Sequence, residues 1–169
     1  MTLLNIKPFQ ESLHQGMCGP ACLKMVLDYW GIHRTEKEMA DLRSVPSSTN
    51  TSDKEIKGIA ESFGMKVEIK SQSGFEDIFY WIDKKVPVIV DWFTRGRSDY
   101  SDSEVADGHY SVVVGLDDSF IYLQDPEIGS LRTLRREDFM KVWFDFTGET
   151  INSWDEMIIR QLIAIYPNP

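Results

Sequence analysis

Two cysteines and three histidines supply the side chains best suited to nucleophilic chemistry in this 169-residue chain. Cys18 precedes Gly19, Pro20 and a long apolar run, and proline is favoured in the first turn of a helix. We therefore expect Cys18 at a helix N-terminus, where unbonded backbone N–H groups and the helix dipole favour a thiolate. The same N–H groups supply part of an oxyanion hole for acyl transfer. An isolated cysteine is usually an ordinary core residue, but this position favours Cys18 as a nucleophile over Cys22.

The candidate general base is His109. It follows Gly108 and opens the apolar, β-branched run HYSVVVGL, which is typical of a strand. His14 lies in a polar leader and His33 in the turn after the first helix, so we expect both rings to be solvated. Imidazole titrates near neutral pH, which suits it to accept the thiol proton.

Asp125 is the candidate residue that orients His109. The strands on either side of residues 117–119 form a predicted hairpin, and a three-residue turn there places Ser111 opposite Asp125. Asp125 is then diagonal to His109 on the same face, with backbones about 7–8 Å apart. Its carboxylate would accept a hydrogen bond from one ring nitrogen and leave the other for the thiol proton.

The turn length decides whether this geometry is possible. The three-residue turn pairs Leu116 with Phe120, whereas a two-residue turn would put His109 and Asp125 on opposite faces of the hairpin. Asp125 also precedes Pro126, so a plain turn residue is the alternative interpretation.

The periodicity of apolar residues, together with glycine, proline and capping residues, predicts the helices and strands that position these residues. A mostly apolar helix is predicted over 19–31, and the patterns Thr35-x-x-Glu38 and Ser52-x-x-Glu55 predict capping boxes. Helices followed by an antiparallel sheet indicate an α+β fold in which the central helix packs on the sheet, as one domain over residues 1–169. The expected helices are 19–31, 35–43, 52–63, 75–84 and 136–144, and the expected strands are 86–93, 109–116, 120–124, 130–134 and 158–166.

Composition limits the classes of partner. The formal net charge of -9 and the pI near 4.8 argue against nucleic acid, which requires a basic surface. No apolar stretch approaches membrane-spanning length and the first residues lack a signal-peptide core, so we expect a cytoplasmic protein with free thiols. A metal held by Cys18, Cys22 and a histidine is poorly supported because no second closely spaced ligand pair exists, and we expect no cofactor.

Three segments resemble one known family. They are Cys18-Gly19-Pro20-Ala21-Cys22-Leu23 with Met25-Val26-Leu27, Gly108-His109-Tyr110 before a Val-rich strand and Gly115, and Asp125-Pro126. Together they are similar to the bacteriocin-processing (double-glycine) peptidases and their stand-alone relatives in the papain-like clan, over about residues 5 to 165. The resemblance implies a papain-like cysteine peptidase fold and cleavage of a peptide or isopeptide bond through a thioester.

The resembled family also carries a glutamine shortly before the cysteine, which completes the oxyanion hole. Gln10 stands eight residues before Cys18 in a similar segment, slightly farther than usual, and Gln15 stands three residues before it. We favour Gln10 because Gln15 is too close in the chain to fold back easily over the site. Both remain open.

Two other functions fit the same residues. A transglutaminase-like or amide-transferring enzyme would share the acylation step and differ only in the acceptor, and a non-catalytic leader-peptide-binding module would need no nucleophile. Cys18 is present, which disfavours the second. The long polar stretch 94–108 is expected to be a mobile lid that sets specificity, and its carboxylates suit either a basic substrate or a solvated face.

Overall fold

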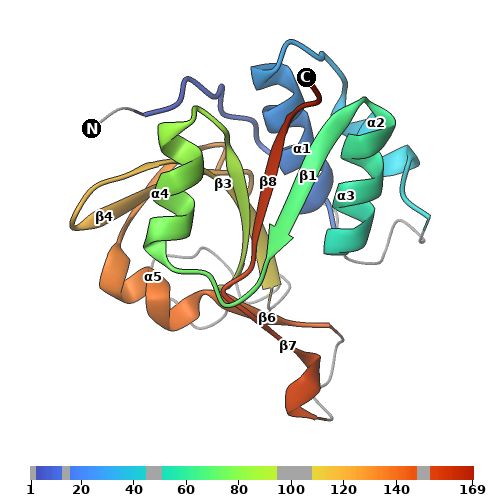
Figure 1. Ribbon diagram of the computed structural model, residues 1–169. Helices are drawn as coiled ribbons and strands as arrows, with labels where there is room; N and C mark the ends of the chain where they lie inside the picture. The colour runs from blue at the N-terminus through green and yellow to red at the C-terminus, as the bar shows by residue number, and fades with distance from the viewer. Residues whose placement is uncertain (1–2, 13–15, 45–50, 95–107, 148–152) are drawn as a thin grey trace.

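The computed structural model describes residues 3–12, 16–44, 51–94, 108–147 and 153–169 (Figure 1). Its helices are α1 (Cys18–Tyr29), α2 (Glu36–Asp41), α3 (Asp53–Ser62), α4 (Phe75–Asp83) and α5 (Arg136–Val142), with a short 3-10 helix η1 (Trp154–Glu156). Its strands are β1 (Met65–Lys70), β2 (Val88–Phe93), β3 (Gly108–Leu116), β4 (Phe120–Asp125), β5 (Ser130–Arg135), β6 (Phe144–Phe146), β7 (Met157–Ile159) and β8 (Leu162–Pro167).

Six of these strands form one sheet in the order β1-β8-β2-β3-β4-β5, and β6 pairs only with β7 in a second, small sheet. Every pairing is antiparallel. The last described strand, β8, lies between β1 and β2, so the sheet joins the first and the last of its strands along the chain. This confirms the expected α+β class with an antiparallel sheet.

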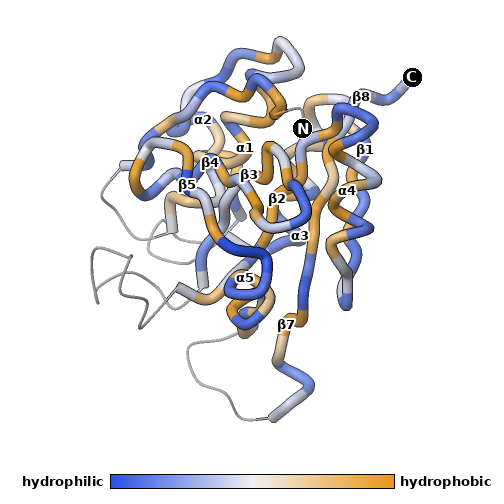
Figure 2. The backbone as a smooth tube through the Cα atoms, turned by 90° about the vertical axis from the view of Figure 1, so that its left-hand side faces the viewer, coloured by the Kyte–Doolittle hydropathy of each residue, from blue (hydrophilic) through white to orange (hydrophobic). Residues whose placement is uncertain are grey.

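Helices cover both faces of the sheet. In Figure 1, α4 lies in front of the strands and α1 behind them, and Figure 2 shows β2 and β3 between the two helices after a 90° turn. Helices α2 and α3 pack against α1. Because β3 is sandwiched in this way, it is buried along almost its whole length, and it appears as a largely hydrophobic strand in Figure 2.

The helix α1 is the buried centre of the fold, as its sequence predicts. Pro20 occupies its first turn, and Gly31 follows its last with a φ of +80°. Its polar stripe consists of Lys24 and Asp28, which form an ion pair with 2.5 Å between Nζ and Oδ2. Cys18 is the first residue of this helix, so its position is fixed by packing on nearly all sides of α1.

Both predicted capping boxes are present. The Oγ1 of Thr35 accepts from the backbone N–H of Glu38 at 3.1 Å, and the Glu38 carboxylate accepts from the Thr35 N–H at 2.7 Å. Ser52 and Glu55 make the same two bonds at 3.3 and 3.0 Å. These caps satisfy N–H groups that would otherwise lack partners at the start of α2 and α3.

Some elements differ from the expected ones. Strands β1 and β6 were not predicted, and the strand expected over 158–166 is divided into β7 and β8. The division falls at Arg160, whose φ of +46° is incompatible with an extended strand.

The predicted three-residue turn of the β3–β4 hairpin is wrong. Leu116 faces Ile121, not Phe120. The backbone N–H of Asp117 donates to the Phe120 carbonyl at 3.0 Å, and Asp117 Oδ1 accepts from the Ser119 N–H at 2.9 Å. The turn therefore contains one residue more than expected.

A β-bulge corrects this difference before the hairpin reaches its other end. The register shifts between Val113 and Gly115, and beyond the shift Val112 faces Gln124. That pairing is the one the three-residue turn predicts. The bulge thus restores the face on which His109 was expected.

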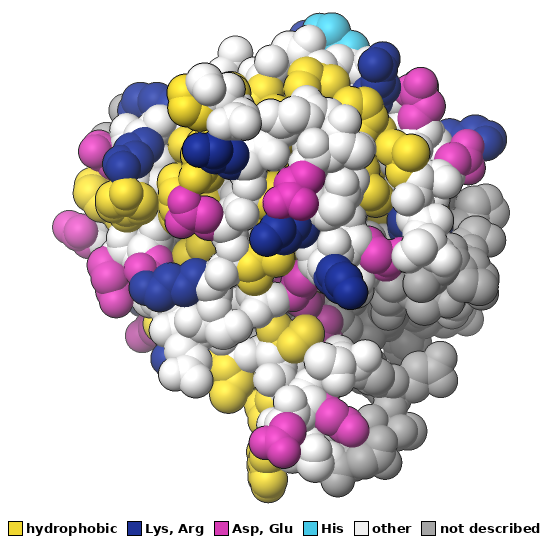
Figure 3. All heavy atoms as spheres, turned by 45° about the vertical axis from the view of Figure 1, so that its right-hand side comes forward, with side chains coloured by type: hydrophobic (Ala, Val, Ile, Leu, Met, Phe, Trp, Pro, Cys, Tyr) yellow, Lys and Arg dark blue, Asp and Glu magenta, His cyan; other side chains and the backbone are white. Residues whose placement is uncertain are grey.

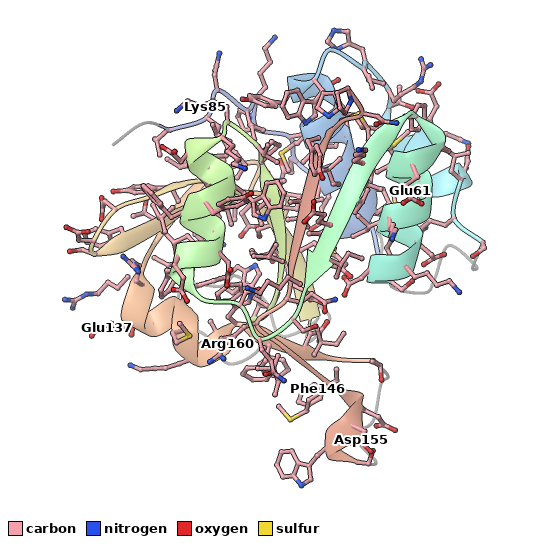
Figure 4. All side chains as sticks on the ribbon, in the orientation of Figure 1. Glu61, Lys85, Glu137, Phe146, Asp155 and Arg160 are labelled. Atoms are coloured by element: carbon pink, nitrogen blue, oxygen red, sulfur yellow. The ribbon has the colours of Figure 1, made fainter. Side chains whose placement is uncertain are left out.

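The surface mixes charges of both signs with small apolar groups on the face drawn in Figure 3. Strands β6 and β7 extend away from the main sheet, and Figure 4 shows Phe146 and Asp155 on this extension. Within the described residues, every helix is too short or too polar to cross a membrane. His14, Gln15 and nearly all of the expected lid, residues 95–107, lie outside the described residues.

Candidate active site

The helix α1 presents Cys18 at its N-terminus. Cys18 is partly exposed, whereas Cys22, one turn further, is fully buried. Among the described residues no side chain caps the helix at Met17, so no cap competes with an anion for the N–H groups of its first turn. Burial and the charges of Cys18, Glu11 and Asp125 raise the pKa of Cys22 well above its usual value, which makes Cys22 a poor nucleophile.

His109 and Asp125 meet across the β3–β4 hairpin. The Nε2 of His109 donates to Oδ1 of Asp125 at 2.7 Å, and the two side chains are only 2% and 0% exposed. Trp92 packs edge-on against the imidazole at 6.0 Å between ring centroids and donates from Nε1 to Ser111 at 3.0 Å. The ring is therefore held by a hydrogen bond on one side and by an aromatic wall on another.

The pKa of His109 reflects its interactions with Asp125 and Cys18. Burial lowers it, but the charge of Asp125, the hydrogen bond to Asp125 and a side-chain hydrogen bond with Cys18 outweigh burial, so the pKa stands well above its usual value. An imidazolium is thus stabilised beside the thiol. With Nε2 committed to Asp125, Nδ1 is the ring nitrogen available to accept the thiol proton.

A buried arginine, which the sequence analysis missed, completes the surroundings of Asp125. The Nε of Arg132 donates to Oδ2 of Asp125 at 2.6 Å, and the backbone N–H of Glu127 donates to Oδ1 at 3.0 Å. Burial raises the pKa of Asp125, but His109 and Arg132 together bring it below its usual value. Asp125 is therefore an ionised acceptor. A signal was present in β5, since Arg132 shares the core-facing alternation with buried Leu134.

Gln10 lies beside the turn that follows Asp125. Its side chain is exposed, and Nε2 donates to the Glu127 carbonyl at 3.3 Å. Gly129 has a φ of +62°, and a Cβ at this position would lie 2.6 Å from the Gln10 Cβ. Only glycine combines that conformation with the close passage of the N-terminal segment.

The neighbouring residue, Glu11, has a side chain that interacts with the charges of His109 and Asp125. Its backbone N–H donates to the Pro126 carbonyl at 2.8 Å. Burial raises the pKa of Glu11 to about 7, the charge of His109 opposes this rise, and the charges of Asp125 and Glu127 add to it. Sequence reasoning did not single out Glu11, because nothing in one extended segment shows which of two adjacent side chains turns inward.

A cluster of acidic residues lies near Tyr110, the residue that follows His109 on β3. The Tyr110 hydroxyl donates to Oδ1 of Asp53 at 2.5 Å. Burial, the charges of Asp145 and Asp53 and a hydrogen bond with Asp145 raise the pKa of Asp91 well above its usual value. Burial and the neighbouring carboxylates thus favour the neutral form of Asp91. Asp145 also covers Gly108, where an added Cβ would lie 2.0 Å from a carboxylate oxygen.

This arrangement suits nucleophilic catalysis. It contains a thiol at a helix N-terminus, a buried imidazole bonded to it and a carboxylate bonded to the imidazole. Among the described residues, no group of three or more His, Cys, Asp or Glu side chains is placed to hold a metal ion.

Residues 3–151 match the profile of the Peptidase_C39 like family. Two curated relatives from methanogens are named as uncharacterized proteins. The protein from Methanothermobacter marburgensis is 33% identical over 139 residues, and the one from Methanothermobacter thermautotrophicus is 30% identical over 139 residues. Each alignment covers 79% of this chain and 79% of the relative.

Solved structures of C39 peptidase domains share the fold. The peptidase domain of Streptococcus ComA, a bifunctional ABC transporter involved in quorum sensing, superposes with a TM-score of 0.71 at 18% identity, covering 96% of this chain and 99% of that domain. A C39-like peptidase from Bacillus anthracis gives 0.69 at 16% identity, covering 98% and 97%. A double-glycine motif protease from an AMS/PCAT transporter, in complex with its leader peptide, gives 0.64 at 16% identity, covering 98% and 94%. The family and the fold are those of cysteine peptidases, as the resemblance implied.

Proposed function

This chain belongs to the Peptidase_C39 like family, and from that premise we propose that it is a cysteine peptidase that cleaves a peptide or isopeptide bond. Cys18 is the nucleophile, His109 the general base and Asp125 the orienting carboxylate. The observation that carries the proposal is the buried 2.7 Å bond between His109 and Asp125 beside Cys18 at the start of α1.

The chemistry proceeds in two halves. His109 Nδ1 takes the Cys18 proton, and the thiolate attacks the carbonyl carbon of the scissile bond. The tetrahedral intermediate collapses to a thioester as the leaving amine takes the proton from the imidazolium. A water molecule, deprotonated by His109, then attacks the thioester and releases the acid and the thiol. Asp125 stays ionised throughout and stabilises the imidazolium each time it forms.

The negative oxygen of the tetrahedral intermediate needs donors. The backbone N–H of Cys18 is one, and we assign Gln10 as the other. The Gln10 side chain is exposed and bonded only at 3.3 Å to the Glu127 carbonyl, so it must turn to reach an oxyanion. Gln10→Ala is expected to slow acylation by about a hundredfold or more, the usual cost of a lost oxyanion donor. A larger loss in Gln15→Ala would reassign the role to Gln15.

The reactivity of the two thiols tests the nucleophile. The protein is incubated with iodoacetamide from pH 5 to pH 9, and the labelled cysteine is identified by mass spectrometry. Cys18 is expected to react near neutral pH in the wild type and in the matched control Cys22→Ala, and to lose this reactivity in His109→Ala. Equal labelling of both cysteines, or labelling independent of His109, would refute the mechanism.

Peptide turnover tests the reaction itself. A peptide with a double-glycine motif, the motif for which the AMS/PCAT relative is named, is the first probe, with Cys18→Ala as the control. Products carrying the mass of water indicate hydrolysis, whereas an added amine incorporated into the product would indicate acyl transfer. Binding of this peptide without turnover by the wild type would instead favour a leader-peptide-binding module.

A further inference from the structure

Arg132 reaches Asp125 from the neighbouring strand. In the β4–β5 ladder Arg132 faces Leu123 and Ser130 faces Asp125, so Arg132 and Asp125 are diagonal neighbours on one face. Leu131 and Thr133, on either side of Arg132, are exposed, whereas Arg132 is 7% exposed. The guanidinium is therefore built into the interior behind the carboxylate.

The contacts of Asp125 are divided between its two oxygens. Oδ1 accepts from His109 at 2.7 Å and from the Glu127 N–H at 3.0 Å, and Oδ2 accepts from Arg132 at 2.6 Å. Since donors lie on both sides of the carboxyl group, its plane is fixed. The direction in which His109 points follows from that plane.

The charges of the site balance only when Arg132 is counted. Once the proton has moved to His109, Cys18 and Asp125 are anions and His109 is a cation, which leaves one net negative charge beside a buried surface. The guanidinium of Arg132 brings the sum of the four side chains to zero. Net charge in a poorly solvated site is costly, so this balance favours the state from which Cys18 attacks.

We propose that Arg132 is a positioning residue of the active site, which keeps Asp125 ionised and oriented so that His109 presents Nδ1 to Cys18. The inference rests on the proposed function, because Arg132 acts only through the other three residues. Further titratable groups interact with this set. Glu11 in the N-terminal segment acts on His109 and Asp125, Cys22 on α1 acts on Cys18 and Asp125, and Asp91 on β2 and Tyr110 on β3 act on Cys18. Glu127, in the turn after β4, and Glu36 on α2 act on Glu11. Four of these groups are carboxylic acids, which adds to the need for a cation.

The experiment measures the rate of Cys18 alkylation by iodoacetamide against pH in the full chain. Arg132→Gln removes the charge that keeps Asp125 ionised, so the acid limb of the profile is expected to move up by about one pH unit or more, the usual effect of one close opposite charge on a carboxylate. Near pH 6 the rate is expected to fall about tenfold. Arg135→Gln is the matched control, because Arg135 lies on the same strand with its side chain 67% exposed, and its profile should equal that of the wild type.

A double variant separates this role from a merely structural one. In the Asp125→Asn background no carboxylate remains to be kept ionised, so adding Arg132→Gln should not move the acid limb further. Arg132→Lys, which keeps the charge but loses the fixed direction of the guanidinium, should keep the acid limb and lose part of the plateau rate. This variant preserves a buried cation and carries the test where Arg132→Gln does not fold.

Three results would overturn the inference. They are an Arg132→Gln profile equal to that of Arg135→Gln, an equal shift in the Asp125→Asn background, and an Arg132→Lys plateau equal to the wild-type plateau. If wild-type Cys18 reacts no faster than a free thiol, the proposed function fails and the inference fails with it. Normal wild-type reactivity with an unchanged Arg132→Gln profile refutes the role of Arg132 alone.

Discussion

The side chain of Thr51 lies directly against the backbone of Gly19, the residue after Cys18. A Cβ on Gly19 would be 2.6 Å from the Thr51 Cβ and 2.8 Å from its Oγ1. The same Oγ1 donates to the Gly16 carbonyl at 3.3 Å, and Arg43 Nη1 donates to that carbonyl at 3.0 Å. Thr51 therefore contacts the chain both before and after Cys18, and it connects the start of α1 to the segment that leads into α3.

Gly19→Ala is expected to displace the start of α1. The new methyl group cannot fit against Thr51 without a backbone shift, because Thr51 is buried and held by hydrogen bonds. We expect the rate of Cys18 alkylation at pH 7 to fall at least about tenfold and the protein to lose about 1–3 kcal/mol of stability, the usual cost of overpacking. Iodoacetamide kinetics and thermal unfolding measure the two effects.

Gly58→Ala is the matched control for this prediction. Gly58 also lies in a helix, α3, and a Cβ there would meet nothing within 4 Å. Alanine should raise the stability by about 0.5–1 kcal/mol, the usual difference from glycine within a helix, and leave alkylation unchanged. If both variants behave alike, the contact between Gly19 and Thr51 has no role in placing Cys18.

Glu11→Gln should change the pH dependence of stability. The pKa of Glu11 is raised from 4.5 to about 7, mainly by burial, so the folded state disfavours its ionised form. The stability that the neutral acid contributes is fully present below pH 4.5 and is lost as the pH rises through 7. Glutamine does not ionise, and the variant should gain on the wild type between pH 5 and pH 8, by at most about 3 kcal/mol.

Thermal unfolding at pH 5 and at pH 8 measures the gain in stability of Glu11→Gln over the wild type. Glu76 is exposed on α4, and Glu76→Gln is the control that should give the same difference from the wild type at both. An equal difference for Glu11→Gln at pH 5 and pH 8 would mean that Glu11 does not change its charge there.

Asp91→Asn should be tolerated at neutral pH. Asp91 is 2% exposed, and burial together with Asp145 and Asp53 raises its pKa well above the usual value. Asp91 and Asp145 share a hydrogen bond, and the asparagine N–H can donate to Asp145 as a protonated Asp91 would. Because the stability from the neutral acid declines as the pH rises above 3.8, the variant should become progressively more stable than the wild type from pH 5 to pH 8.

Urea denaturation across this range checks the trend. Asp118→Asn, which changes an exposed residue of the β3–β4 turn, should show no such trend. A variant that is less stable than the wild type by a constant amount would show that Asp91 is ionised when folded and that its carboxylate is required.

The part of the site that local rules govern could be predicted from the sequence. The Gly-Pro start and apolar composition of α1 placed Cys18, and the strand that begins at Gly108 placed His109. The hydrogen bond from His109 to Asp125 agrees with the predicted pairing. Arg132 was not predicted to belong to the site because arginine on a strand is usually solvated. Its burial depends on Asp125, which lies on another strand.

Strand β1 was missed for a related reason. It is an edge strand in which only Met65 is buried, so little of the alternation that signals a strand is present. The β-bulge in β3 was hidden in the opposite way. Val112, Val113 and Val114 are all buried because both faces of β3 are covered, and a continuous apolar run carries no trace of a register shift.

That bulge separates the two ends of the hairpin. We expect that a one-residue change in the length of the turn 117–120 is absorbed by a compensating change at Val114 before it reaches the bond between His109 and Asp125. A one-residue deletion at Asp118 is thus expected to be survivable if the irregularity at Val114 disappears with it. The chemistry at the base of this hairpin is consequently protected from a one-residue change at its outer tip.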